Sequence, residues 1–392
     1  MAKLYDYIPA PERVSSDYYI TCHYYPGWDK DGDVSHRGME DMKLYPDRRP
    51  MLGYYNENNP EVMDWEIKWA CEHGINCFLF CWYRYKANEG KPVTRKDLRL
   101  AHIIHEVYKK AKFREYMDYA IMWECQKTWG AVSDADDLVN HLLPFWVENY
   151  FTDPGYMKIN GKPIVYVYDP NTLVAAFGSA QKCAEGFALA NEKIKTYGFE
   201  GILFACEQYR PDLSELAHLK SAGFDCAFQY GWYPEKADVT EEMYAEYLNT
   251  VCLPSEFVIE FEQARIKERI KSFPGFCMFT NSVSRDATEK WLNTFGRTKL
   301  SNGELQWCLS HSEYKTSLVK CKAIIDTLPE GDIGKKYVVL DNWNEWGEGH
   351  FISPCAKNGF KYLQAVREVY TACDNLPDYR TPEVLGFGPY EE

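Results

Sequence analysis

Two glutamates near the end of the chain stand three residues apart and are flanked by tryptophans. Glu345 and Glu348 lie in the stretch KYVVLDNWNEWGEGHFISP at 336–354. In a continuing strand this spacing would send the side chains to opposite faces, whereas a tight turn puts them on the same side. Gly347 and Gly349 permit such a turn. Hydrolysis of a glycosidic bond requires two carboxyls, one to protonate the leaving oxygen and one to act as base or nucleophile. The pair therefore predicts a catalytic site for glycosidic bonds.

Aromatic and polar side chains surround the two glutamates in the same stretch. Flat apolar rings suit the faces of sugars, and amides can hydrogen-bond to sugar hydroxyls. The substrate-binding candidates from this stretch are Trp343, Asn344, Trp346 and His350.

The pair must be held by the element that precedes it. The continuous apolar run 337–340 predicts a strand buried on both faces, as in a parallel sheet. Seven comparable runs come earlier and alternate with helical patterns. The predicted strands span 18–25, 75–83, 119–124, 162–169, 201–207, 224–230, 275–281 and 336–343. The predicted helices span 61–73, 98–111, 136–150, 180–197, 213–222, 241–271, 287–295 and 313–328. Eight such alternations predict an α/β fold of the (β/α)8 TIM-barrel type, with 1–392 as a single domain and long loops at 29–60 and 235–274. A doubly wound sheet is disfavoured because no glycine-rich phosphate-binding pattern follows any strand.

In a barrel, functional groups gather at the carboxyl ends of the strands. Polar and aromatic residues stand at these predicted ends. The further substrate-binding candidates are Tyr24, Tyr25, Trp28, Trp82, Trp123, Glu124, Trp232 and Asn281. Asp169 and Glu207 stand at two other strand ends, and each of Glu124, Asp169 and Glu207 could contact substrate or be paired with an arginine. Arg285, after the seventh predicted strand, could contact substrate or hold such a carboxylate.

Composition narrows the class of partner. The chain of 392 residues has a formal net charge of −14 and an aromatic content of 16%. This charge argues against nucleic-acid and anionic-membrane partners, and the aromatic content fits an oligosaccharide or polysaccharide substrate. No signal peptide or membrane span is visible. The 14 cysteines are scattered without zinc-ligand spacing, which suggests reduced core thiols and a cytoplasmic location, with secretion after removal of a leader as the alternative.

The histidines give little support to a metal site. His102 and His105 are the closest pair, but they lie mid-helix in the predicted structure and lack the glutamate of the HExxH motif. We expect neither a metal nor another cofactor.

Several segments together resemble a known family. They are HYYPGW, NPEVMDWEIKWACEHGINCFLFCWY, YFTDPGYMKINGKPIVYVYDP, AGFDCAFQY and, most specifically, NWNEWGEGHFISP. The chain resembles the glycoside hydrolase family 99-like group, which contains endo-α-mannosidases and a WbsX-like branch from polysaccharide loci. The resemblance implies a (β/α)8 barrel that acts on glycans.

The resemblance also implies roles for the two acids. Glu348 would be the general acid and then the base, with a pKa that we expect to be raised by the apolar Trp343 and Trp346. Glu345 would deprotonate the sugar 2-hydroxyl, which then attacks the anomeric carbon to give a 1,2-anhydro sugar. That retaining route suits α-mannosides or α-rhamnosides. Gly347 stands where the mannosidases have a histidine, which places the chain nearer to the WbsX-like branch.

Two other functions remain open at this point. The first is a WbsX-like glycosyltransferase in polysaccharide biosynthesis, for which Asp31-Gly32-Asp33 supplies a DxD sequence, although no strand precedes it. The second is a non-catalytic glycan-binding barrel, against which the presence of both acids argues.

Overall fold

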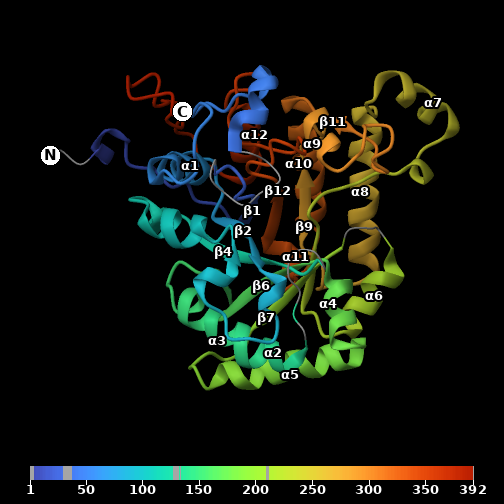
Figure 1. The fold of residues 1–392 in the computed structure, drawn as a ribbon. Helices are drawn as coiled ribbons and strands as arrows, with labels where there is room; N and C mark the ends of the chain where they lie inside the picture. Colours follow the sequence, from blue (N-terminus) through green and yellow to red (C-terminus); the bar gives the residue numbers. More distant parts are fainter. Residues whose placement is uncertain (1–3, 30–37, 127–131, 133, 209–211, 392) are drawn as a thin grey trace.

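A computed structural model describes residues 4–29, 38–126, 132, 134–208 and 212–391. Its centre is a sheet of eight parallel strands, ordered β8-β7-β6-β4-β2-β1-β12-β9 (Figure 1). These strands are β1 (Tyr19–Tyr24), β2 (Cys77–Arg84), β4 (Asp118–Glu124), β6 (Lys162–Tyr168), β7 (Leu203–Glu207), β8 (Cys226–Phe228), β9 (Phe279–Ser282) and β12 (Tyr337–Asp341).

The two edge strands of this sheet meet and nearly close it into a barrel. Ala227 of β8 forms a parallel bridge with Cys277, just before β9. The Ala227 amide donates to the Phe276 carbonyl at 2.7 Å, and the Met278 amide donates to the Ala227 carbonyl at 2.8 Å. Each of the eight predicted strands is present, so the predicted (β/α)8 barrel is confirmed.

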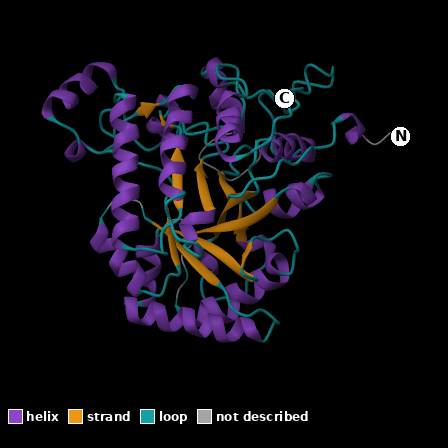
Figure 2. Cartoon of the chain, turned by 180° about the vertical axis from the view of Figure 1, so that it is seen from behind, coloured by secondary structure: helices purple, strands orange, loops and turns teal. Residues whose placement is uncertain are grey.

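Helices surround the strands (Figure 2). They are α1 (Pro60–Glu72), α4 (Pro170–Phe177), α5 (Ala180–Lys195), α6 (Leu213–Ser221), α7 (Glu241–Thr250), α8 (Ser255–Ser272), α9 (Glu289–Thr294), α10 (His311–Ile325), α11 (Ile333–Lys336) and α12 (Lys361–Tyr370). Between β4 and β6 the helical segment alternates α2 (Ala135–Asp137) and α3 (Leu143–Trp146) with π-helical turns at Leu138–Leu142 and Val147–Phe151. None of the helices in the described ranges is long and apolar enough to cross a membrane.

Side-chain caps fix where several helices begin. The Asn59 side chain accepts the Glu61 amide ahead of α1, and Ser310 and Glu313 form a capping box at the start of α10. Such caps satisfy amides that have no partner within the helix. Apolar faces of the helices pack on the strands, and one buried apolar cluster extends from Ile8 to Tyr370. The single-domain organisation of 1–392 stays a prediction. The 14 cysteines are all free, and most are buried.

The segment 98–111 differs from its predicted single helix. Its first two residues form β3 (Leu98–Arg99), which pairs antiparallel with Tyr83 and Arg84 of β2. Only after these does the chain turn into π-helical (Ile103–Val107) and 3₁₀ (Tyr108–Lys110) turns. The end of β2 needs partners for its backbone groups, and Leu98 and Arg99 supply them. This pairing overrides the helix propensity of these two residues.

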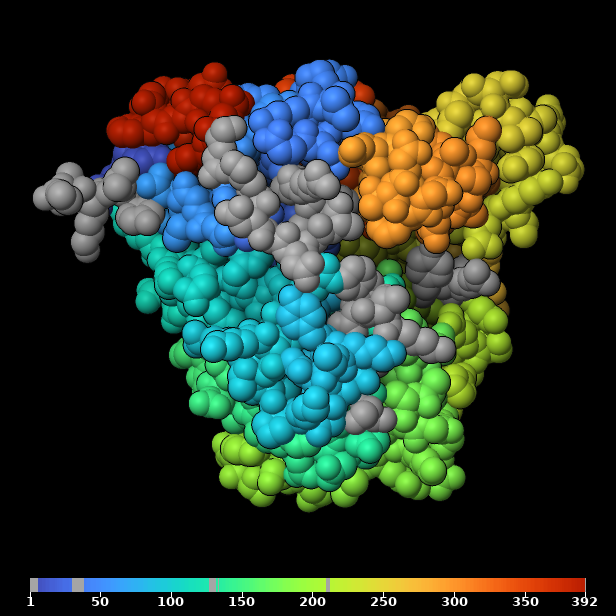
Figure 3. All heavy atoms as spheres, in the orientation of Figure 1, coloured from blue at the N-terminus to red at the C-terminus, as the bar shows by residue number. Residues whose placement is uncertain are grey.

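The long loop after β1 contains 3₁₀ turns at Gly38–Leu44 and Pro46–Arg48. The Tyr45 hydroxyl accepts the Lys290 amide at 3.1 Å, and Lys290 lies 3.7 Å from Asp41. The loop (blue) therefore lies beside the segment around α9 (orange) in Figure 3. The Asp31-Gly32-Asp33 sequence lies outside the described residues.

Candidate active site

A cavity of about 900 Å³ opens at the carboxyl ends of the barrel strands. Its walls combine polar and apolar surface, and the described residues that line it include seven carboxyls and three guanidinium groups. The carboxyls are Glu124, Asp169, Glu207, Glu215, Glu304, Glu345 and Glu348. The guanidinium groups are Arg99, Arg285 and Arg297.

The predicted turn brings Glu345 and Glu348 into this one cavity. Glu345 and His350 form an antiparallel bridge, and the Gly349 amide donates to the Glu345 carbonyl at 3.0 Å. Gly349 has a φ of +78°, and a Cβ there would lie 2.0 Å from the Asp286 carbonyl oxygen. This position therefore requires glycine, and the turn that it allows puts both carboxyls on the cavity wall.

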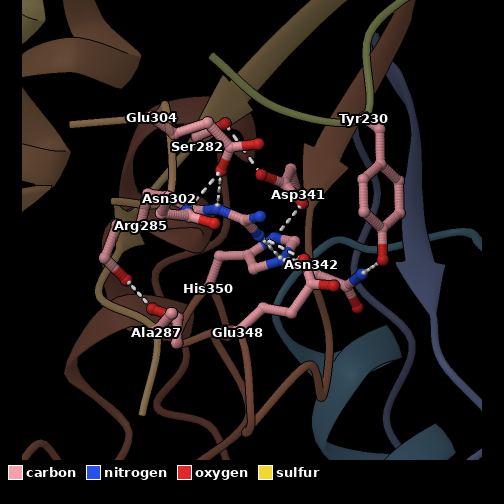
Figure 4. A network of polar contacts seen from close by, with 12 residues as sticks. Tyr230, Ser282, Arg285, Ala287, Asn302, Glu304, Asp341, Asn342, Glu348 and His350 are labelled. Carbon is pink, nitrogen blue, oxygen red and sulfur yellow. Dashed lines mark hydrogen bonds and ion pairs between the residues drawn. The ribbon is translucent and has the colours of Figure 1, made fainter. Parts of the chain in front are cut away.

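Two cationic side chains hold Glu348 (Figure 4). Arg285 Nη1 contacts Glu348 Oε2, and His350 Nε2 lies 2.9 Å from the same oxygen. Burial favours the neutral acid, but Arg285 and His350 outweigh it and hold the pKa of Glu348 below its ordinary range. The expected raised pKa of Glu348 is therefore wrong: the sequence did not reveal that two cations would meet this carboxylate.

The cations are themselves anchored. His350 Nδ1 lies 2.6 Å from Asp341 Oδ1, and the Ser282 hydroxyl donates to Asp341 Oδ2 at 2.9 Å. Burial opposes a charge on His350, yet Asp341 and the hydrogen bond with Glu348 raise its pKa to about 9. Arg285 Nε donates to Glu304 Oε2 at 2.8 Å.

Glu345 has a different environment from Glu348. Its side chain is buried, and within the described part of the chain its Oε1 has no hydrogen-bond partner. Burial, reinforced by the negative charge on Glu348, raises the pKa of Glu345 well above its usual value. These surroundings favour the protonated form of Glu345.

Four of the predicted site residues line the cavity. These are Tyr25, Glu124, Glu345 and Glu348. His350 does not line it but reaches it through Glu348. The other predicted residues stand behind the wall, which corrects their expected role as walls that contact a sugar. They are Tyr24, Trp28, Trp82, Trp123, Trp232, Asn281, Trp343, Asn344 and Trp346.

Strand alternation explains part of this correction. Successive side chains of a strand point to opposite faces, so only one of two neighbours can face the barrel interior. Trp82 points outward and donates its Nε1–H to the Tyr150 hydroxyl at 2.9 Å, while Tyr83 lines the cavity. Trp123 likewise packs on Trp146, with ring centroids 5.1 Å apart.

The same alternation separates two further neighbours. The Tyr24 hydroxyl donates to Glu66 of α1 at 2.8 Å, while Tyr25 lines the cavity. Asn281 of β9 points to Glu262 of α8, with its Nδ2 3.4 Å from Oε1. These side chains attach helices to the outer face of the barrel.

The remaining tryptophans support the wall from behind. Trp28 Nε1 donates to the Asn344 carbonyl at 2.9 Å, and the Asn344 amide group bonds to the backbone of Tyr25 at 2.8 and 3.0 Å. Trp232 Nε1 donates to the Thr280 carbonyl at 3.0 Å. Trp343 packs against Phe78, and Trp346 packs against Phe351. These contacts fix the backbone that carries Tyr25 and the acid pair.

Two residues at the site, Tyr233 and Glu304, were not among the sequence candidates, whereas Tyr230 stands at the end of the sixth predicted strand. Tyr233 packs under the guanidinium of Arg285, 4.9 Å from its ring centroid, and Tyr230 bonds to Asn342 at 3.0 Å. Arg285 could be singled out because it follows a strand. It lines the cavity and holds Glu304 and Glu348 rather than one of the strand-end carboxylates expected as its partners. Glu304 lies in an irregular segment, where no pattern would indicate it.

The two neighbouring histidines have separate partners. His102 Nε2 lies 2.9 Å from Glu57, and His105 Nε2 lies 2.9 Å from the Tyr150 hydroxyl. Among the residues that the structure describes, no group of three or more His, Cys, Asp or Glu side chains is arranged to hold a metal ion.

Comparisons with known proteins agree with this fold. An uncharacterised protein, WxcX of Xanthomonas campestris pv. campestris, is 22% identical over 354 residues, which cover 84% of this chain and 44% of that protein. The chain thus spans less than half the length of the curated relatives that it matches.

Two solved structures resemble the whole barrel. A glycoside hydrolase-like protein superposes with a TM-score of 0.62 at 15% identity, covering 93% of this chain and 97% of the other. The family 99 endo-α-mannosidase of Bacteroides thetaiotaomicron, in complex with bis-tris-propane, gives 0.59 at 16% identity, covering 90% and 97%. At these identities the likeness shows the shared fold. A family model described as glycosyltransferase WbsX matches residues 44–366, and the chain therefore belongs to the WbsX family, within the family 99-like group.

Proposed function

We propose that this chain is a retaining glycoside hydrolase that acts on α-linked glycans of the α-mannoside or α-rhamnoside kind. The observation that carries the proposal is the pair Glu345 and Glu348, which lines one cavity at the carboxyl ends of the barrel strands. Family membership and the shared fold support a glycoside-acting enzyme.

The electrostatics of the pair suit this chemistry. Cleavage of a glycosidic bond needs one carboxyl that carries a proton and one that is ionised. Burial makes Glu345 neutral, and Arg285 and His350 keep Glu348 charged. Environments that push two neighbouring pKa values apart are typical of an acid and its ionised partner.

The stereochemical course rests on the resemblance. In the 1,2-anhydro route the sugar 2-hydroxyl attacks the anomeric carbon from the face opposite to the leaving group. A second carboxyl then needs only to take the hydroxyl proton, and no covalent sugar–protein intermediate forms. Substrates with a trans arrangement of the 2-hydroxyl and the leaving group, such as α-mannosides and α-rhamnosides, satisfy this requirement.

A WbsX-like glycosyltransferase is the second candidate, and the description of the family model favours it. A nucleotide-sugar donor would bring a diphosphate into a cavity whose described carboxyls outnumber its guanidinium groups. The guanidinium of Arg285 is already engaged by Glu304 and Glu348, which supports the hydrolase over the transferase. Thermal stabilisation by nucleotide sugars, with no stabilisation by free oligosaccharides, would favour the transferase instead.

The experiment that tests the proposal is release of product from aryl α-mannosides, α-rhamnosides and α-glucosides and from mannan. We expect the wild type to cleave an α-mannoside or α-rhamnoside with retention, as followed by proton NMR of the first-formed anomer. Glu348→Gln should lose this cleavage, whereas Glu330→Gln, at an exposed position, should keep it. Full activity in Glu348→Gln, or an inverted product, would contradict the proposal.

A further inference from the structure

Aromatic side chains of α9 continue the cavity wall outward from the acid pair. The guanidinium of Arg285, which contacts Glu348, lies 5.6 Å from the ring centroid of Trp291. Trp291 packs against Phe295 at the end of α9, with the ring centroids 4.8 Å apart. Both rings line the cavity, and Phe295 is 46% exposed. The wall therefore runs from the acids to a ring that is open to solvent.

Phe295 is the most exposed aromatic side chain among the described residues that line the cavity. Tyr230, Tyr233 and Trp291, by comparison, are at most 8% exposed. An exposed phenyl ring offers a flat apolar face to the C–H groups of a sugar, and contact between the two removes apolar surface from water. Phe295 is thus a platform on which one sugar ring can stack.

Arg297 lines the same cavity two residues after Phe295. Gly296 between them has a φ of +65°, and the Arg297 amide donates to the Leu292 carbonyl at 2.9 Å. This is the left-handed turn with which many helices end. It fixes the backbone from which the Arg297 side chain starts.

The guanidinium of Arg297 is positioned by a buried amide. Its Nη1 donates to Asn302 Oδ1 at 3.2 Å, and Asn302 Nδ2 donates to Glu304 Oε2 at 3.3 Å (Figure 4). The segment between Arg297 and Asn302 is held as well, because the Tyr247 hydroxyl donates to the Lys299 carbonyl at 3.2 Å. The fold thus holds one nitrogen of the guanidinium and leaves its other donors for the cavity.

No carboxylate pairs with Arg297 within the described part of the chain. Its partner there is the neutral amide of Asn302, whereas Arg285 is engaged by both Glu304 and Glu348. A guanidinium presents its N–H donors in a planar fork that matches the two oxygens of a carboxylate. Arg297 therefore offers a charged, planar binding group beside the exposed ring of Phe295.

Four of the seven carboxyls of the cavity do not act as uncompensated negative charges toward a ligand. Glu304 and Glu348 share Arg285. Burial raises the pKa of Glu124 well above its usual value and that of Glu207 to about 8. A count of carboxyls therefore overstates the negative charge that a ligand on the α9 wall meets.

We propose that Phe295 and Arg297 form a subsite for a uronic acid, whose ring stacks on Phe295 and whose carboxylate bonds to Arg297. This inference rests on the proposed hydrolase function and narrows its substrate class. The substrate is then an acidic glycan, in which a uronic acid is attached to the α-mannose-like or α-rhamnose-like sugar that lies at the acid pair.

Binding of matched ligands tests the subsite. The probes are oligosaccharides of mannose or rhamnose with glucuronic acid, each compared with the same oligosaccharide after its carboxyl has been reduced to a primary alcohol. In calorimetric titrations at low ionic strength, we expect the wild type to bind the acidic form about tenfold or more tightly than the reduced form. Added salt should weaken binding of the acidic form alone. Equal affinity for the two forms, or binding of neither, would overturn the inference.

Variants separate the contributions of the two side chains. Arg297→Gln should abolish the preference for the acidic form, and Arg297→Lys should keep part of it, because the charge remains while the planar fork is lost. Phe295→Ala should weaken binding of both forms by about three- to tenfold, because stacking does not depend on the carboxylate. Arg380→Gln and Phe387→Ala are the matched controls at exposed positions outside the cavity, and both should bind as the wild type does. A preference that survives Arg297→Gln would overturn the inference.

Binding and cleavage are measured separately, so the subsite and the hydrolase can fail independently. A wild type that prefers the acidic form but cleaves no substrate would support the subsite and count against the proposed hydrolase. Cleavage of an aryl α-mannoside or α-rhamnoside, together with equal affinity for the acidic and reduced forms, would support the hydrolase and overturn the subsite.

Discussion

Two groups of buried carboxyls face each other across the cavity, and they differ in what compensates their charge. Glu348 and Glu304, near the end of β12, share Arg285, and His350 adds a second cation for Glu348. Glu124 and Glu207, at the ends of β4 and β7, are more deeply buried than Glu348, whose side chain is 20% exposed, and the described residues give neither of them an ion pair.

The consequence is that carboxyls lining the same cavity favour opposite charge states. Burial raises the pKa of Glu124 well above its usual value and that of Glu207 to about 8. Burial acts on Glu348 as well, but Arg285 and His350 outweigh it and lower the pKa of this carboxyl. The comparison shows that depth in the barrel makes a carboxyl neutral, and that a charged carboxylate exists only where the fold delivers a cation to it.

The largest effect should come from removing the shared cation. Arg285→Gln removes the guanidinium that Glu304 and Glu348 share, and it leaves His350 as the cation beside Glu348. This loss should cost about 3–5 kcal/mol in the free energy of unfolding and about a hundredfold in kcat/KM. Urea denaturation and steady-state kinetics measure these. Arg265→Gln removes partly exposed ion pairs with Asp238 and Glu268, and it should change stability by no more than about 1 kcal/mol. Equal effects of the two substitutions would show that the Arg285 ion pairs contribute no more to stability than partly exposed ones.

A smaller, pH-dependent effect is expected at His350. Its folded pKa of about 9 lies above the ordinary 6.5, so its contribution to stability is fully present below pH 6.5 and is lost as the pH rises through 9. Asp341→Asn should remove up to about 3 kcal/mol at pH 6 and much less at pH 10. Unfolding free energies of the two proteins across this range measure the effect, and a difference that grows with pH would contradict it.

Substitution of Glu207 on the other wall should change stability in the opposite direction, by stabilising the protein rather than destabilising it. The folded pKa of Glu207, about 8, lies above the ordinary 4.5, so the folded protein binds the extra proton and loses stability as the pH rises from 4.5 to 8. Glu207→Gln removes this penalty and should stabilise the protein by about 1–3 kcal/mol at pH 8, with little gain at pH 4.5. Thermal unfolding at both pH values measures the effect. Glu330→Gln is the exposed control, and destabilisation by Glu207→Gln at pH 8 would show that this carboxylate has a cationic partner.

The smallest effect concerns two neighbours on β2 that face opposite ways. Trp82→Phe should lose about 1–2 kcal/mol of stability, because the hydrogen bond to Tyr150 is broken in the core, and its KM should stay within twofold of the wild type. Tyr83→Ala should instead raise KM severalfold, since Tyr83 lines the cavity. Kinetics and thermal unfolding of the pair measure both outcomes. A tenfold change in KM for Trp82→Phe would place that ring at the substrate.

The fold could be predicted well because its signals are local. Each buried strand is a short apolar run that ends at polar or aromatic residues, and Gly74 and Gly223, both with positive φ, mark turns that precede the strands β2 and β8. The segment 98–111 was predicted incompletely because its first two residues pair with the end of β2. That pairing depends on where β2 lies in the fold, and local helix propensity carries no information about it.

The site could be predicted only in part. The acid pair could be predicted because Glu345 and Glu348 are only three residues apart in the sequence and glycines permit the turn between them. The prediction that these aromatic side chains line the cavity was wrong. A tryptophan at a strand end looks the same in the sequence whether its side chain faces the cavity or the helices, and a shift of one residue along the strand decides between the two.

The sequence by itself determined a parallel barrel with two glutamates at the mouth, since strand period, glycine turns and the spacing of Glu345 and Glu348 are properties of the chain read in order. Only the tertiary structure decided which of the two is charged. Arg285, Glu304 and Asp341 come to the pair from separate segments, and the pKa of a buried carboxyl depends on the distances to these charges. Such distances exist only once the chain has folded.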